Sequence, residues 1–167
     1  MRSLTIRSFT LHEVHALSHH VSVVCSANAD EAFAYLADPA KLGEWTLGSW
    51  GATLRDGGVV EGTSLFDGTS SLVAVMPHPA QMTVDFHVGS DPSRLAFRIA
   101  ARVVPGESLG RPESSSLVSL DAWRPEGMDD GRWTQLCRSH EAEILILRHR
   151  IERLASGLTE RDRSDVD

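Results

Sequence analysis

The chain has 167 residues, of which 41% are hydrophobic and 23% charged; this is typical of one folded domain and excludes an intrinsically disordered chain. Sixteen Lys and Arg residues against 23 Asp and Glu give a net charge of −7, which disfavours a nucleic-acid-binding protein, because such proteins neutralise phosphates with basic side chains. No apolar run is long enough for a signal peptide or a membrane span, and Cys25 and Cys137 form no CxxC pattern. We therefore expect a cytoplasmic protein.

The first structured elements are expected after a weakly periodic extension over residues 1–17. The alternating, β-branched segment 18–25 predicts a strand. Asn28 followed by Glu31 is a helix-start pattern, and Pro39 predicts where that helix ends. The loop or short helical turn that follows carries Trp45 and Trp50.

A run of strands follows, separated by turn sequences such as DGG, DGT and GSDPS. The expected strands are 51–55, 59–66, 70–76, 80–88, 94–104 and 115–124. Several alternate between apolar and polar residues, which indicates an antiparallel sheet with one face exposed to water. The alternation places Phe86 and Phe97 on the inner face, and the polar set Asp85, His87, Arg98 and Arg102 on the outer face.

The last segment, 129–155, has no Pro and only Gly131 near its start, and predicts one long amphipathic helix. One face gathers Trp133, Leu136, Cys137, His140, Ile144, Leu147, Ile151 and Leu154. Asp129 and Asp130 at its start complement the helix dipole. We expect one domain over 18–156 and a tail over 157–167.

This order of elements resembles the helix-grip fold of the START/Bet v-like (SRPBCC) superfamily, which includes polyketide cyclase/dehydratase-like proteins. The segment VSVVCSANADEAFAYLADPAKLGEW at 21–45 carries the resemblance, with a looser match in the strands GTSLFDG and VDFHVG. The resemblance implies an α+β fold in which a curved antiparallel sheet of about seven strands wraps a long C-terminal helix and leaves a cavity. It implies a fold and a pocket, but not a reaction.

His140 is the strongest candidate for chemistry, because it lies in the middle of the apolar face of the last helix. In a helix-grip fold that face looks into the cavity, where a histidine could relay a proton. The alternative is a core histidine that bonds a strand carbonyl or a water. The expected ligand-binding residues around it are Phe33, Trp45, Phe86, Phe97, Trp133, Leu136, Ile144 and Leu147.

Three other groups of residues have simpler explanations than chemistry. Asp85, His87, Arg98 and Arg102 could form an acid/base set, but cross-strand pairs on a wet face explain them equally well. His12, Glu13, His15, His19 and His20 resemble a metal cluster in composition, yet on a strand His19 and His20 point to opposite sides. Cys137 could pair with His140, although a buried cysteine is more often a small hydrophobe. No metal and no cofactor are expected.

Three functions remain open on the sequence alone. The leading hypothesis is a carrier or sensor that binds a small hydrophobic molecule, aromatic, polyketide-like or lipid-like. The second is a cyclase or dehydratase that uses His140 as a proton shuttle without a covalent nucleophile. The third is a protein-partner module, and the sequence also leaves a homodimer open.

Overall fold

The computed structural model describes residues 17–157, and it contains one antiparallel sheet of seven strands in the order β1-β7-β6-β5-β4-β3-β2. The strands are β1 (Ser18–Cys25), β2 (Trp50–Leu54), β3 (Val59–Thr63), β4 (Ser70–His78), β5 (Thr83–Gly89), β6 (Ala96–Pro105) and β7 (Ser116–Trp123). Strands β2 to β7 form a meander in which each strand pairs with the next. β1 pairs with β7, so β1 and β2 are the two edge strands. The expected strands are confirmed, with Trp50 starting β2 rather than lying in a loop.

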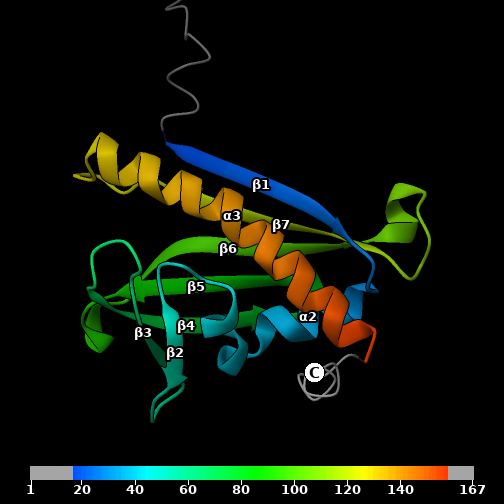
Figure 1. The fold of residues 1–167 in the computed structure, drawn as a ribbon, viewed down its shortest axis with the longest axis horizontal. Coiled ribbons are helices and arrows are strands. Elements are labelled where there is room, and N and C mark those ends of the chain that lie inside the picture. Colours follow the sequence, from blue (N-terminus) through cyan, green and yellow to red (C-terminus); the bar gives the residue numbers. More distant parts are fainter. Residues whose placement is uncertain (1–16, 158–167) are drawn as a thin grey trace, which may run out of the picture.

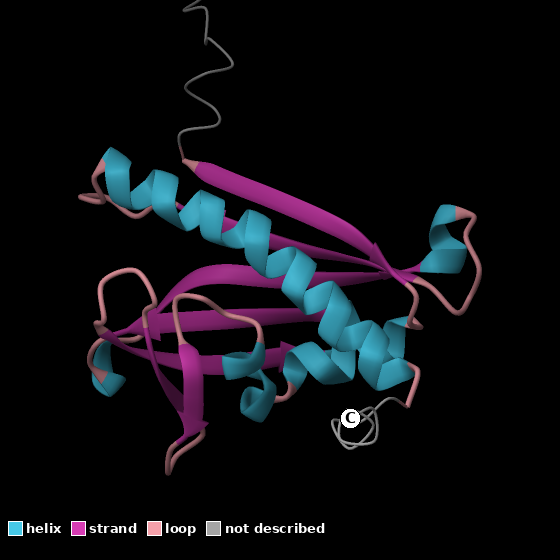
Figure 2. Ribbon diagram, viewed as in Figure 1, coloured by secondary structure: helices cyan, strands magenta, loops and turns pink. Residues whose placement is uncertain are grey.

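Two helices and a 3-10 turn pack on the same face of the sheet. They are α2 (Ala29–Ala37), η1 (Pro39–Glu44) and α3 (Asp130–Ala155), and shorter 3-10 turns are η2 (Pro79–Gln81), η3 (Pro92–Arg94) and η4 (Gly106–Leu109). Figure 1 shows α3 crossing the sheet diagonally, with its first half beside β1 and its second half near α2. Figure 2 shows how much of the fold is sheet, and that α3 is by far the longest helix.

Local capping sets both helix starts, as the sequence predicts. The Asn28 side chain accepts a hydrogen bond from the Glu31 amide at 2.9 Å, and the Glu31 carboxylate accepts one from the Asn28 amide at 3.0 Å. This reciprocal box satisfies two backbone donors that the helix itself leaves free. At α3, the Asp129 carboxylate accepts from the Arg132 amide at 2.8 Å.

The alternation along β6 breaks at Arg98, and this corrects one predicted cavity residue. Phe86 of β5 pairs with Ile99, but the next residue, His87, pairs with Phe97, so Arg98 is the extra residue of a bulge. Beyond the bulge the side chains change faces. Ile99 stays inside, whereas Phe97 turns outward, is 42% exposed and lies 4.9 Å from Trp123 between ring centroids.

Asp85 and His87 of β5 and Arg102 of β6 lie on the outer face, as the alternation predicts, while Arg98 is the unpaired residue of the bulge. Asp85 does not pair with an arginine there; its carboxylate lies 3.1 Å from Nε2 of His78 on β4. His87 stacks against Phe97 with ring centroids 5.8 Å apart. Neither contact connects with the interior, so this set is no candidate for chemistry in the cavity.

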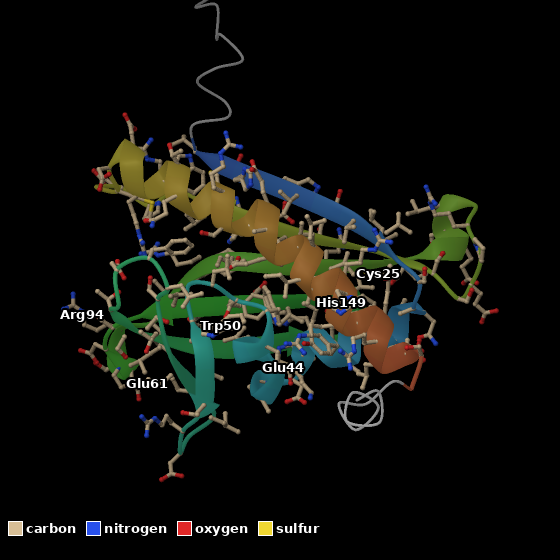
Figure 3. The ribbon with its side chains drawn as sticks, in the orientation of Figure 1. Cys25, Glu44, Trp50, Glu61, Arg94 and His149 are labelled. Atoms are coloured by element: carbon tan, nitrogen blue, oxygen red, sulfur yellow. The ribbon has the colours of Figure 1, made fainter. Side chains whose placement is uncertain are left out.

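A close approach fixes the segment that precedes β2. At Gly62 on β3, a methyl group would lie 2.6 Å from the carbonyl oxygen of Ser49, well inside van der Waals contact. In Figure 3, the labelled residues Trp50 and Glu61 show where β2 and β3 lie, at one edge of the sheet. Only glycine at position 62 lets the strand pass so close to the Ser49 backbone.

We predict that Gly62→Ala lowers the free energy of unfolding by about 1–3 kcal/mol, because the added methyl group overpacks the site. Gly48→Ala is the matched control, since a methyl group there meets no atom within 4 Å. Chemical denaturation of both variants provides the measurement. Equal stability of the two variants would contradict the close approach.

Candidate functional site

A cavity of about 150 Å³ lies between the first half of α3 and the sheet. Its apolar lining consists of Leu42, Trp45, Phe66, Val73, Phe86, Val88, Ile99, Leu120 and Leu136. Its polar lining consists of Thr46, Ser49, Ser71, Arg132, Gln135, Ser139, His140 and Glu143. The cavity is therefore mostly apolar, and its ionisable groups all come from α3.

The predicted ligand-binding residues fall into three groups. Trp45, Phe86, Leu136 and His140 line the cavity. Trp133, Ile144 and Leu147 are buried without bordering it, and Phe33 packs against the core. Phe97 is on the outer face. Ile144 and Leu147 do not reach the cavity because α2 packs against α3 and against the sheet, and so covers the second half of the apolar face of α3.

His140 is held neutral by its surroundings. Its side chain is only 3% exposed, and burial lowers its pKa from 6.5 to about 4, with His19 nearby acting in the same direction. The His19 and His140 rings are 6.0 Å apart. The Nδ1 atom of His140 is buried and has no hydrogen-bond partner among the described residues. A neutral imidazole can donate or accept a hydrogen bond, but at pH 7 it is a weak base here.

Glu143 is the group that sequence reasoning missed. It is 5% exposed and borders the cavity one turn after His140. Its Oε1 atom accepts hydrogen bonds from the backbone amides of Leu47 at 2.6 Å and Gly48 at 3.4 Å. A signal was available, because three residues along a helix is about 60° around its axis, within the apolar face. A glutamate at such a position is either paired or functional.

Burial also changes the ionisation of Glu143. It raises the pKa of the carboxyl from 4.5 to about 7, and the two amide hydrogen bonds oppose the rise without cancelling it. Oε2 lies 3.9 Å from Nε2 of His140, within the range of an ion pair. However, between pH 4 and pH 7 the pKa shifts leave both groups mostly uncharged. We therefore describe them as a neutral acid–imidazole pair.

The segment 45–49 is held against α3 and the sheet from several sides. The Ser71 hydroxyl donates to the Gly48 carbonyl at 3.0 Å and also contacts the Ser49 hydroxyl. The Leu65 amide donates to the Leu47 carbonyl at 3.0 Å. Together with Glu143, these bonds fix the inner wall of the cavity, so the carboxyl has a preset position.

The opening of the cavity lies between the β3–β4 loop and the first turns of α3. Phe66 is 40% exposed and lines the cavity from that loop. Beside it, Asp67 lies 3.6 Å from the Arg132 guanidinium. Because both side chains are more than 40% exposed, this ion pair contributes little to stability.

Two other candidates receive no support from the geometry. Burial raises the pKa of the Cys137 thiol, which disfavours the thiolate that a nucleophile needs. His12, Glu13 and His15 lie outside the described residues, while His20 bonds Asp121 at 2.7 Å and His19 turns toward α3. Among residues 17–157, no three His, Cys, Asp or Glu side chains are grouped so that they could hold a metal ion. No helix in that range is long and apolar enough to cross a bilayer.

Comparison with solved structures agrees with this architecture. A START superfamily protein from Mycobacterium smegmatis aligns with 86% of this chain and 99% of its own, at 14% identity and a TM-score of 0.52. The chain has the helix-grip fold. The di-domain ARO/CYC protein BexL of the BE-7585A biosynthetic pathway aligns at 19% identity and a TM-score of 0.59, over 81% of this chain and 46% of BexL. An Aha1 protein from Colwellia psychrerythraea, solved as a dimer, aligns at 14% identity and a TM-score of 0.57, over 81% of this chain and 96% of its own.

In sequence, no family model and no curated protein matches the chain. The identities above are low enough that the structural likeness establishes the fold alone. The START-like and polyketide cyclase-like resemblance expected from residues 21–45 is thus confirmed at the level of the fold.

We predict opposite pH dependences for the two members of the pair. The folded chain binds the Glu143 proton more tightly than the unfolded chain does. The contribution of Glu143 to the free energy of unfolding therefore falls as pH rises from 4.5 to 7. His140 binds its proton less tightly in the folded chain than in the unfolded chain. Its contribution to the free energy of unfolding therefore falls as pH drops from 6.5 to 4. The free energy of unfolding of Glu143→Gln should rise by roughly 1–3 kcal/mol relative to that of the unchanged chain as pH rises. That of His140→Phe should rise by a similar amount, relative to the unchanged chain, as pH falls.

Denaturant unfolding at a series of pH values between 4 and 8 measures both trends. The comparison with the unchanged chain removes the contributions of other titrating groups. Parallel curves for the three proteins would show that neither group has the shifted pKa.

Proposed function

We propose that this protein binds a small, mostly apolar molecule in the cavity beneath α3, as a carrier or sensor. The observation that carries the proposal is the cavity itself, about 150 Å³ of space lined mainly by apolar side chains and reached past Phe66. Unfilled apolar space weakens packing, because its lining loses dispersion contacts. A ligand restores those contacts, and such pockets with a few polar groups are typical binding sites.

The chemistry of the lining favours a flat or ring-shaped ligand. Trp45 and Phe86 meet edge to face, with centroids 6.0 Å apart and ring planes at 72°. Both rings border the cavity, so a third aromatic ring can pack against them in the offset or edge-on geometries that aromatic groups prefer. BexL, which shares the fold, is named an ARO/CYC protein of a biosynthetic pathway, and this supports a polyketide- or aromatic-type ligand as the first class to test.

The direct test is native mass spectrometry of the protein purified from its own host, followed by denaturation and analysis of the released molecules. We predict a stoichiometric lipophilic mass. Leu136→Trp should remove it, because Leu136 lines the cavity and the larger side chain fills it. Leu145→Trp is the matched control, since Leu145 lies on the same helix and is 60% exposed.

Loss of the ligand in Leu136→Trp with retention in Leu145→Trp supports the proposal. Equal occupancy of the two variants would place the molecule elsewhere. Absence of any bound molecule across several preparations would count against a carrier and favour a transient substrate.

A second candidate function is proton-transfer catalysis of the cyclase or dehydratase type, and Glu143 is the observation that favours it. A general base works best when its pKa lies near the operating pH, which fits the Glu143 carboxyl at about 7 better than His140 at about 4. In this scheme the Glu143 carboxylate takes a proton from the carbon next to a ligand carbonyl. The Nε2–H group of His140 then donates a hydrogen bond to the enolate oxygen, and the proton returns to the product.

Deuterium exchange at the methyl group of acetophenone, followed by NMR in D₂O, tests this candidate without knowledge of the natural substrate. The protein should accelerate the exchange, and Glu143→Gln should lower that acceleration by roughly 10²–10⁴-fold. His140→Gln should also slow the exchange while leaving the fold intact; an unchanged rate would rule His140 out. No acceleration by the unchanged protein would leave binding as the only function of the cavity.

The protein-partner module is the third candidate, and the outer face bears on it. Phe97, Trp123 and His87 form an exposed aromatic group there, with Phe97 and Trp123 4.9 Å apart. Exposed apolar patches can mark interaction surfaces. However, the open cavity on the other face favours a ligand over a partner as the main function.

A further inference from the structure

The polar end of the cavity contains two atoms that no described residue satisfies. Glu143 uses Oε1 to accept the Leu47 and Gly48 amides, but Oε2 has no hydrogen-bond donor within the described chain. Nε2 of His140 lies 3.9 Å away, too far for a hydrogen bond between the two. Both side chains border the cavity, and both are at least 93% buried. The fully buried, unpartnered nitrogen of His140 is Nδ1, whereas Oε2 and Nε2 stay accessible from the cavity and are free to bond a guest.

The spacing of the two atoms suits a partner that bonds both at once, such as a ligand hydroxyl group or a water molecule. An oxygen placed between Oε2 and Nε2 can lie at normal hydrogen-bond distance from both, because the gap is shorter than two such bonds end to end. A hydroxyl group donates one hydrogen bond and accepts another. It therefore fits either proton arrangement of the pair: it donates to a carboxylate and accepts from Nε2–H, or accepts from a protonated acid and donates to bare Nε2. A carbonyl can only accept, and an ammonium group can only donate.

The size of the cavity limits the rest of the ligand. An apolar cavity of roughly 150 Å³ holds a benzene-sized molecule. The volume here is about 150 Å³, and the walls of the cavity include Trp45 and Phe86, whose rings suit an aromatic guest. A ligand with more than one ring must extend past Phe66 toward the opening.

We propose that the cavity selects a phenol-type ligand, a single aromatic ring whose hydroxyl group bridges Glu143 Oε2 and His140 Nε2. This inference rests on the proposed binding function and adds the chemical class of the group that enters. The carboxyl also explains what is excluded: a carboxylate ligand would meet Glu143 rather than a cation at the inner end. The one lining cation, Arg132, lies at the opening and faces Asp67.

The test compares p-cresol with p-xylene, two molecules of the same shape that differ by a hydroxyl in place of a methyl group. Dissociation constants come from NMR titration of the ¹⁵N-labelled full chain. Without recognition of the hydroxyl, p-xylene binds more tightly, because it is the more hydrophobic of the two. We expect p-cresol to bind at least fivefold more tightly than p-xylene.

Variants then assign the preference to the pair. His140→Phe and Glu143→Leu should each lower the ratio of the two affinities by about tenfold, since each removes one end of the bridge. Ser139→Ala is the matched control: Ser139 also lines the cavity, but its hydroxyl already donates to the Gln135 carbonyl at 2.8 Å. A general change in cavity shape moves both ligands together and leaves the ratio intact. If Glu143→Leu fails to fold, His140→Phe decides alone.

The outcomes separate the inference from the function on which it rests. A ratio that favours p-cresol, falls in the two pair variants and persists in Ser139→Ala supports the inference. Binding of both molecules with no preference for p-cresol, or with a preference that the pair variants do not change, overturns it and leaves an apolar binding cavity. If neither molecule binds while native mass spectrometry finds a cavity ligand, the phenol class is overturned and the binding function stands. If neither molecule binds and no ligand is found, both fail.

Discussion

The carboxyl of Glu143 connects two parts of the chain that form the wall of the cavity. It belongs to α3, yet its Oε1 atom binds the backbone of the segment that leads into β2, almost a hundred residues earlier in the chain. This contact closes the inner end of the cavity, because it fixes the distance between the helix and the wall formed by residues 45–49. A hydrophobic side chain at position 143 would fill space, but it could not satisfy the Leu47 and Gly48 amides.

The arrangement carries an energetic cost that stability alone does not explain. Burial of a carboxyl is unfavourable unless its oxygen atoms are hydrogen bonded; in the described chain Oε1 is bonded, whereas Oε2 faces the cavity without a protein donor. His140 next to it adds a second buried polar ring with an unpartnered nitrogen. Two incompletely bonded, largely buried ionisable groups beside a mostly apolar cavity are a feature of binding and catalytic sites, where polar atoms are available to a ligand.

Much of the fold could be predicted because it depends on local patterns. The Asn28 capping box, the strand alternation of β5 and the apolar face of α3 need no information from distant residues. Phe97 could not be placed, because the Arg98 bulge is set by pairing between β5 and β6, and one extra residue reverses the side-chain direction. Ile144 and Leu147 share the face of His140, but whether they meet the cavity or the core depends on where α2 packs. Glu143 was missed because charged residues on an apolar face are usually explained by exposure, and here the exposure is 5%.

The opposite pKa shifts of His140 and Glu143 have a common cause with a functional consequence. Burial disfavours the charged form of each group, so it lowers the pKa of the base and raises that of the acid. Both groups are therefore mostly uncharged just below pH 7. An uncharged ligand can then bind beside them without the cost of removing water from a charged group. At the same time Glu143 can lose its proton near pH 7, so the pair stays able to accept a proton from a bound molecule. The same two residues can thus serve in binding or in proton transfer, and the acidity of the ligand decides between these roles. A simple phenol keeps its hydroxyl proton. A carbon acid bound beside Glu143 can instead transfer its proton to the carboxylate.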